Sequence, residues 1–285
     1  MQKEISIRTD LALESYDSND NKLPQGVFVD EQKSGGVLKT TVKIDTEEAA
    51  ERLARPIGKY ITLEGDFSLF SDQLCDMLET ELKALLPIGS VLVIGLGNRD
   101  ITPDIIGPMA ASKIMATRHL FSEQLERLGL ENLRSVCSIS PGVMGQTGLE
   151  VLDIVKPLLR EQKFSAVIAI DALAAKSAGR LGSTIQLCTC GISPGSGVLN
   201  RRAELSQQTL GLPVFAIGIP TVVDASTLIA DLCPQCEDFS ATQTMMVTPR
   251  DIDNICAIGS KIISRAINYA LQPSLSHDEI DALTS

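Results

Sequence analysis

Five short apolar runs stand out along the chain, at residues 91–94, 136–139, 166–170, 184–187 and 214–217. A continuous apolar run of this length is typical of a strand that is covered on both faces. Helical spacing of apolar residues appears between and after the runs, near 149–160 and at 249–271. Strands that alternate with helices predict an α/β fold, with a mostly parallel or mixed sheet and helices on both faces.

The first 90 residues carry a different pattern. Residues 37–44 and 59–64 have the short, alternating pattern of strands, and 45–50 has the pattern of a cap followed by a helix. Residues 71–86 form an amphipathic helical pattern that Pro87 closes. Residues 1–35 are polar and rich in turn formers, which predicts a weakly ordered leader or long loops. We therefore expect one α/β domain with a small β-containing segment near its N-terminus.

Composition narrows the class of protein. The 285 residues are 44% hydrophobic and 21% charged, as in a globular domain. The net charge of −11 argues against direct binding to nucleic-acid phosphates. No stretch is apolar enough to predict a membrane span, and the N-terminus lacks the apolar core of a secretory signal. Seven scattered cysteines are typical of reduced thiols in a cytoplasmic protein.

Two familiar kinds of site do not fit the motifs. Gly95 and Gly97 resemble the start of a dinucleotide-binding loop, but Asp100 stands where the third glycine belongs. The two histidines, His119 and His277, are not near strand ends, and no Gly-x-Ser-x-Gly elbow is present. A serine or cysteine nucleophile would therefore lack its usual base.

Four cysteines leave a structural metal site open as an alternative. Cys188 and Cys190 form one pair, and Cys233 and Cys236 form another with the spacing of zinc ligands. The first pair lacks standard spacing, so thiols without a metal are the simpler interpretation.

The carboxylates at strand ends are the stronger candidates. In open α/β sheets, sites form in the loops beyond the carboxyl ends of the strands. Asp104 lies in the loop after the first run, and Asp171 follows the third. Either residue alone is explained as a helix cap or a turn residue. Together they could face one cleft, where two carboxylates that share a proton activate water.

Further residues in these loops are candidate supports for that site. Asn98 and Thr102 would shape the first loop, and Gly142 and Gly145 would let a substrate backbone approach closely. Asp224 follows the fifth run, and its contribution stays open.

Long strings in the same loops resemble the spore germination protease family. The strings lie at 7–14, 95–98 with 102–104 and 107–108, 141–148, 170–175, 192–198, 217–225 and 246–249. They follow the family's order and cover nearly the whole chain. One departure is the short stretch between Asp224 and Met246, where the family has a longer insertion.

The resemblance implies an endopeptidase that degrades small acid-soluble spore proteins during germination, in the cytoplasm of the spore. It implies an α/β core related to the hydrogenase-maturation proteases and a homotetramer. From the residues themselves we expect no cofactor, no metal, and no membrane or direct nucleic-acid partner. By motif, the family's proposed catalytic aspartates fall on Asp104 and Asp171. The alternatives are a metal-dependent protease of the hydrogenase-maturation type and an inactive binding or regulatory homologue.

The resemblance also implies a zymogen. The string that begins at Thr9 is similar to the acidic-then-apolar sites that the family cleaves, which places a cut between Asp10 and Leu11. Residues 1–10 would be the propeptide and 11–285 the single α/β peptidase domain. We expect an accessible, flexible segment around the cut; an edge strand over 7–13 is the alternative.

Overall fold

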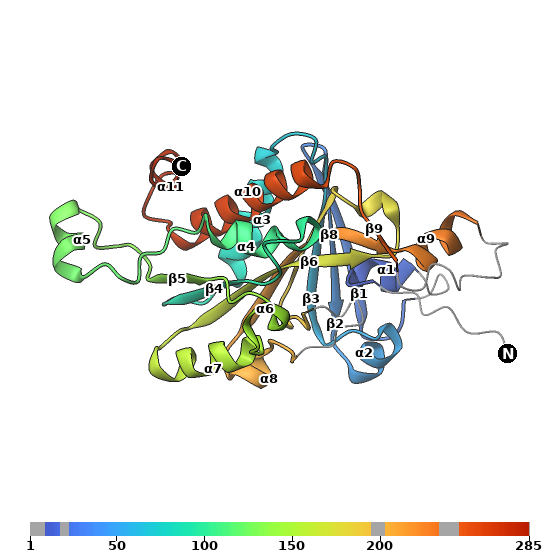
Figure 1. The fold of residues 1–285 in the computed structure, drawn as a ribbon, viewed down its shortest axis with the longest axis horizontal. Coiled ribbons are helices and arrows are strands. Elements are labelled where there is room, and N and C mark those ends of the chain that lie inside the picture. Colours follow the sequence, from blue (N-terminus) through green and yellow to red (C-terminus); the bar gives the residue numbers. More distant parts are fainter. Residues whose placement is uncertain (1–8, 18–22, 195–202, 234–244, 285) are drawn as a thin grey trace.

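A computed structural model describes residues 9–17, 23–194, 203–233 and 245–284 (Figure 1). Its centre is one mixed sheet, with strand order β1-β2-β3-β7-β8-β6-β4-β5 and β9 paired to β8. The four strands β5, β4, β6 and β8 are parallel, and β7, β3, β2 and β1 continue the sheet antiparallel. The strands are β1 (Val27–Ser34), β2 (Val37–Ile44), β3 (Gly58–Glu64), β4 (Val91–Gly95), β5 (Val136–Ile139), β6 (Ala166–Ala175), β7 (Thr184–Cys188), β8 (Val214–Asp224) and β9 (Met246–Val247).

Helices cover both faces of this sheet, so the predicted fold class is confirmed (Figure 1). On β4, Val91 and Val93 pack into the core beneath α3, α4 and α10, while Leu92 and Ile94 pack against α7 on the opposite face. This period of two explains why the whole run is apolar. The helices are α1 (Ala12–Asp17), α2 (Glu47–Leu53), α3 (Asp72–Leu85), α4 (Ile106–Ala111), α5 (Ser122–Leu128), α6 (Met144–Thr147), α7 (Val151–Glu161), α8 (Gln207–Leu210), α9 (Ala225–Leu232), α10 (Ile252–Leu271) and α11 (His277–Thr284), with 3₁₀ turns η1 (Thr102–Asp104) and η2 (Ala178–Arg180). No helix among the described residues is long and apolar enough to cross a membrane.

Local signals placed several elements correctly. Strand β2 has the predicted bounds, and α3 begins after Ser71, whose side chain accepts a hydrogen bond from the Leu74 amide as an N-cap. Helix α2 begins after Thr46 in the same way.

The prediction for residues 1–35 is wrong where the structure describes them. Strand β1 pairs with β2 along its whole length, and α1 follows Leu11. Only Val27 of β1 is buried, because this edge strand is held by backbone hydrogen bonds and not by an apolar face. Its sequence therefore shows no alternation from which a strand could be predicted.

Strands β6 and β8 extend beyond their apolar runs. The predicted loop position of Asp171 is wrong, because β6 continues through it to Ala175. β8 continues to Asp224, and the pairing of the two strands shifts register after Leu173. Polar residues are tolerated at these positions because the strands line a cavity there.

Candidate active site

Small side chains hollow one face of the sheet where the parallel and antiparallel halves meet. Ala169 of β6 pairs with Ala216 of β8, and Ala216 also pairs with Cys188 of β7. In the next row, Gly218 of β8 lies between Asp171 of β6 and Gln186 of β7. Cross-strand partners share one face of a sheet, and all of these residues except Ala169 line a cavity.

The cavity has a volume of about 710 Å³. Residues from β3, β6, β7 and β8, from η1, and from the segments beside α1, α2 and β7 line it. Those with ionisable or polar side chains include Asp10, Arg55, Tyr60, Asp104, Asp171, Gln186, Cys188, Cys190, Ser193, Glu204 and Thr221.

Asp171 enters the cavity from within β6. Val167 and Ala169, two and four residues earlier, pack into the core beneath α7. Because side chains alternate along a strand, Asp171 lies on that same face. At this point of β6 the face borders the cavity and no longer an apolar core. The residue is 5% exposed, and its Oδ1 accepts a hydrogen bond from the Ala172 amide at 2.9 Å.

Asp104 reaches the same cavity from η1, beyond the end of β4. Its Oδ2 accepts a hydrogen bond from the Asn98 amide at 2.8 Å. Two further hydrogen bonds hold η1 in place. The Thr221 hydroxyl donates to the Pro103 carbonyl at 2.6 Å, and the Cys256 thiol donates to the Thr102 carbonyl at 3.3 Å. Both candidate aspartates thus line one cavity.

The other candidate residues have varied positions. Asn98 holds Asp104 through its backbone, and its side-chain oxygen accepts from Gln146 at 2.7 Å. Thr102 contributes a carbonyl to the anchoring of η1. Gly142 and Gly145 do not line the cavity.

Asp224 has a structural role. It ends β8 and caps α9, since its Oδ1 accepts from the Thr227 amide at 3.1 Å. It does not line the cavity.

The N-terminal segment also reaches the cavity. Asp10 lines it and is tied to the end of β6, where the Asp10 amide donates to the Ala174 carbonyl and Asp10 Oδ2 accepts from the Ala174 amide, both at 2.8 Å. Gln186 holds the next residues, because its Nε2 donates to the Asp10 carbonyl at 3.0 Å and its Oε1 accepts from the Ala12 amide at 2.8 Å. The Asp10–Leu11 peptide therefore lies beside the strand row that contains Asp171.

This segment is not the accessible, flexible one that we expected. Leu11 is completely buried and packs with Leu173, Ala175 and Val223. The alternative, an edge strand over residues 7–13, also fails for its described part, because α1 begins at Ala12. Buried apolar contacts and the Gln186 hydrogen bonds hold these residues in place.

Several cavity residues were not predicted from the sequence. Gln186, Tyr60 and Arg55 lie on or near antiparallel strands, which the rule of strand carboxyl ends does not cover. Cys188 and Cys190 were singled out as cysteines, but their place in the cavity wall needed the pairing of β7 with β3 and β8. The proposed four-thiolate zinc site includes Cys236, which lies outside the described residues.

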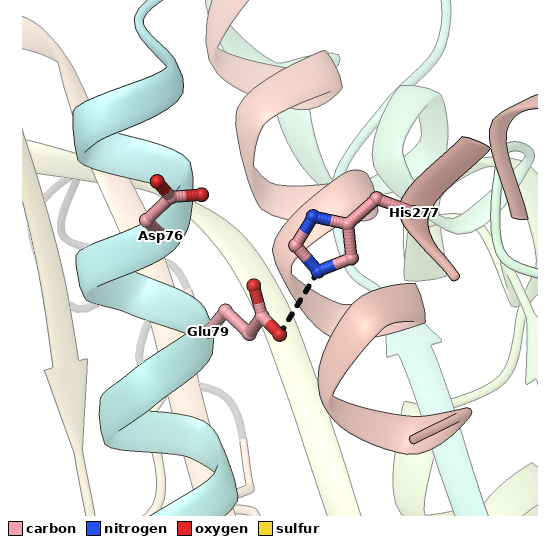
Figure 2. Close-up of side chains that lie close together, drawn as sticks. All are labelled: Asp76, Glu79 and His277. Carbon is pink, nitrogen blue, oxygen red and sulfur yellow. Dashed lines mark hydrogen bonds and ion pairs between the residues drawn. The ribbon is translucent and has the colours of Figure 1, made fainter. Parts of the chain in front are cut away.

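A group of three potential metal ligands lies outside the cavity, on α3 and α11 (Figure 2). Donor atoms of Asp76, Glu79 and His277 lie within 4.8 Å of one another. Glu79 Oε1 is already engaged, by Lys83 Nζ at 2.6 Å and by His277 Nε2 at 3.2 Å. The His277 ring stacks on Tyr269, with centroids 3.7 Å apart. These contacts account for the cluster as a clasp that holds α11 onto α3.

Comparisons with known proteins bear on the identity of this site. A family model described as germination protease matches residues 5–235. The germination proteases of Clostridium tetani and Caldanaerobacter subterraneus are each 38% identical to the chain, over 98% of it and over 99% and 98% of their own lengths. The Bacillus subtilis germination protease is 43% identical over 79% of this chain and 65% of its own.

A structural neighbour and the lengths of the alignments complete the comparison. A NiFe hydrogenase maturation protease from Thermococcus kodakarensis KOD1 is similar over 66% of this chain and 98% of its own, with 14% identity and a TM-score of 0.36. The alignment to the Clostridium tetani protein spans 322 residues, more than the 285 of this chain, so that relative has residues without a counterpart here. Because these relatives match over nearly their full lengths, the chain belongs to the germination protease family.

Proposed function

We propose that this endopeptidase hydrolyses peptide bonds with a paired-aspartate site formed by Asp104 and Asp171. The observation that supports the proposal is that two carboxylates from separate elements, η1 and β6, line one cavity. Asp10 of the N-terminal segment also lines the cavity, and its backbone carbonyl accepts a hydrogen bond from Gln186, which supports binding of a polypeptide there.

The chemistry follows from two carboxylates that share one proton. The ionised carboxylate takes a proton from a water molecule, whose oxygen attacks the peptide carbonyl carbon. The protonated carboxylate donates its proton to the carbonyl oxygen, and a proton returns to the nitrogen as the C–N bond breaks. Two carboxylates in one cavity favour this shared state because ionising both costs electrostatic energy.

The test is cleavage of a purified small acid-soluble spore protein by the wild type and by Asp104→Asn and Asp171→Asn. Each variant keeps a side-chain oxygen that accepts the backbone hydrogen bond seen here. We expect turnover to fall by about 10²–10⁴-fold, the usual effect of losing general acid–base catalysis. Asp100→Asn is the matched control, since Asp100 lies in the same loop, is exposed and does not line the cavity. Near-normal turnover by either cavity variant would refute the dyad, and an inactive wild type would favour the non-catalytic alternative.

The family resemblance supplies the finer parts of the proposal. The substrates are small acid-soluble spore proteins, the site of action is the spore interior, and the active form is a homotetramer. Sedimentation of the purified chain at equilibrium measures the last of these: a mass four times that of the chain supports the tetramer, and a monomer or dimer contradicts it.

The zymogen part of the proposal places the first cut between Asp10 and Leu11, with residues 1–10 as propeptide. The Asp10 carbonyl, which this cut would attack, accepts a hydrogen bond from Gln186 Nε2, and Asp10 lines the cavity that contains both aspartates. Because Leu11 is buried in its own subunit, cleavage within one chain is favoured over cleavage by a neighbour.

Mass spectrometry of the maturing protein tests this part. We expect a new N-terminus at Leu11 and a first-order rate that does not change on dilution, because substrate and site belong to one molecule. The Asp104→Asn variant should stay uncut. An active enzyme that keeps Met1 would exclude the propeptide, and a rate that falls with dilution would indicate cleavage between subunits.

A further inference from the structure

Two thiols lie side by side in the wall of the catalytic cavity. Cys188 ends β7, and Cys190 follows two residues later, with a hydrogen bond between their side chains. Each thiol has a second contact. Cys188 Sγ donates to the Gly191 carbonyl at 3.2 Å, and Cys190 Sγ donates to Tyr60 Oη at 3.1 Å. Both residues line the cavity that holds Asp104 and Asp171.

The surroundings make Cys190 the more reactive member of the pair. Its pKa is lowered, chiefly by the hydrogen bond with Cys188 and also by that with Tyr60 and by the positive charge of Arg55, although burial opposes this. The pKa of Cys188 is raised by its hydrogen bond to Cys190 and by burial. A thiolate beside a protonated thiol is the arrangement found at reactive cysteine pairs.

Three of the other described cysteines lack this arrangement. Burial raises the pKa of Cys75 and of Cys256 to about 12, and it raises the pKa of the half-buried Cys137. None of the three lines the cavity.

We propose that Cys188 and Cys190 are an oxidant-sensitive dithiol that controls access to the catalytic cavity. The Cys190 thiolate attacks one oxygen of a hydroperoxide, the O–O bond breaks, and Cys190 becomes a sulfenic acid. The Cys188 sulfur then attacks the Cys190 sulfur, and the S–O bond breaks with release of water. The two thiols lose two electrons and two protons, and one hydrogen peroxide is reduced to two waters.

The disulfide would alter the cavity because both thiols anchor its wall. Oxidation removes the hydrogen bonds to Tyr60 Oη and to the Gly191 carbonyl. The backbone at Gly191 packs closely against the neighbouring segment, because a Cβ there would lie 2.1 Å from the Leu205 carbonyl oxygen. Ile192, which pairs with Leu205, and Ser193 both line the cavity and follow directly in the chain. A shift of Cys190 therefore moves the wall that a substrate must pass.

The first arm of the test measures the thiols alone. The wild type is exposed to hydrogen peroxide and the remaining thiols are alkylated. The mass of the peptide containing residues 188–190 is then measured by mass spectrometry. We expect a loss of about 2 Da, for two hydrogen atoms, that a dithiol reductant reverses. In Cys188→Ser the disulfide cannot form, and a sulfenic acid on Cys190 should be trapped by dimedone. Cys137→Ser, which removes a half-buried thiol outside the cavity, should behave as the wild type.

The second arm measures cleavage by the same samples. We expect oxidation to lower cleavage by the wild type at least about tenfold, the effect of misplacing a peptide in a site, and a reductant to restore it. Cys190→Ser should resist peroxide. This effect rests on the proposed function, whereas the thiol chemistry does not. Thiols at 188 and 190 that stay fully alkylatable, or an oxidised enzyme with unchanged cleavage, would overturn the proposal, and neither result bears on the aspartate dyad.

Discussion

At the scale of single residues, the position of Asp104 depends on the absence of a side chain at Gly97. Gly97 has φ +116°, and a Cβ there would lie 2.1 Å from the Asp104 carbonyl oxygen and 3.1 Å from its Oδ1. The backbone of the first loop thus folds directly against η1. A glycine in this loop serves close packing of the backbone, and not the binding of a phosphate.

We predict that Gly97→Ala displaces η1 and lowers cleavage at least about tenfold, since small misplacements of a catalytic group are costly. The positive φ adds a loss of stability of about 1 kcal/mol or more. The specificity constant and the thermal midpoint measure the two effects. Gly179→Ala is the control, because its Cβ would meet only Ser177 Oγ, at 3.8 Å, and its φ is ordinary. Unchanged cleavage by Gly97→Ala would contradict this role of the glycine.

At the scale of elements, a partly buried ion-pair cluster joins α3 to the antiparallel half of the sheet. Glu81 of α3 pairs with Lys39 of β2 at 2.8 Å and with Lys59 of β3 at 3.1 Å. Burial by itself raises the pKa of Glu81, but the hydrogen bonds from both lysines outweigh it and lower the pKa. A carboxyl whose pKa falls on folding stabilises the fold above its unfolded pKa, and this stability is lost as the pH falls through the folded pKa.

Glu81→Gln should therefore cost about 1–3 kcal/mol of unfolding free energy at neutral pH, because two lysines lose the charge they face. The difference from the wild type should shrink in acid, where Glu81 is protonated in both states. Urea unfolding at neutral and acidic pH measures this. Glu48→Gln on α2, an exposed position, should show no such difference. A cost that is the same at both values of pH would show that packing, and not charge, holds α3 here.

At the scale of the whole molecule, the two faces of the sheet are covered by residues of different chemistry. One face carries α3, α4 and α10 and the largest apolar core. The other face holds the cavity, whose described lining includes four carboxylates, two thiols and the guanidinium of Arg55. The histidines are not among the lining residues, and His277 is held in the clasp on α3 (Figure 2).

This division predicts that chelators leave the activity unchanged. A catalytic zinc usually has histidine among its ligands, and the described lining offers none. Cleavage assays after treatment with EDTA, compared with untreated enzyme, measure the effect. Activity that is lost on chelation and restored by one added metal would favour the metal-dependent alternative.

Much of the fold could be predicted from the sequence because its signals are local. The apolar runs of the parallel strands are buried on both faces, so burial is visible in the residues themselves. The caps at Thr46 and Ser71 and the spacing within α3 also act over a few residues. Strand β1 could not be predicted because its residues are almost all exposed and show no apolar alternation. Helix α1 could not be predicted because the segment docks against residues far along the chain.

The same distinction applies to the site. The amino-acid sequence determined that acidic residues follow the parallel strands, since Asp171 directly extends an apolar run and Asp104 lies in the loop after another. Only the tertiary structure decided which of them share a cavity, because Asp224 turns away to cap α9 while Asp171 stays within β6. It also decided that Gln186 and the Cys188–Cys190 pair belong beside them. Antiparallel pairing of β7 with β8 brings these residues to the cavity, and such long-range pairing leaves no mark on the neighbouring residues of the chain.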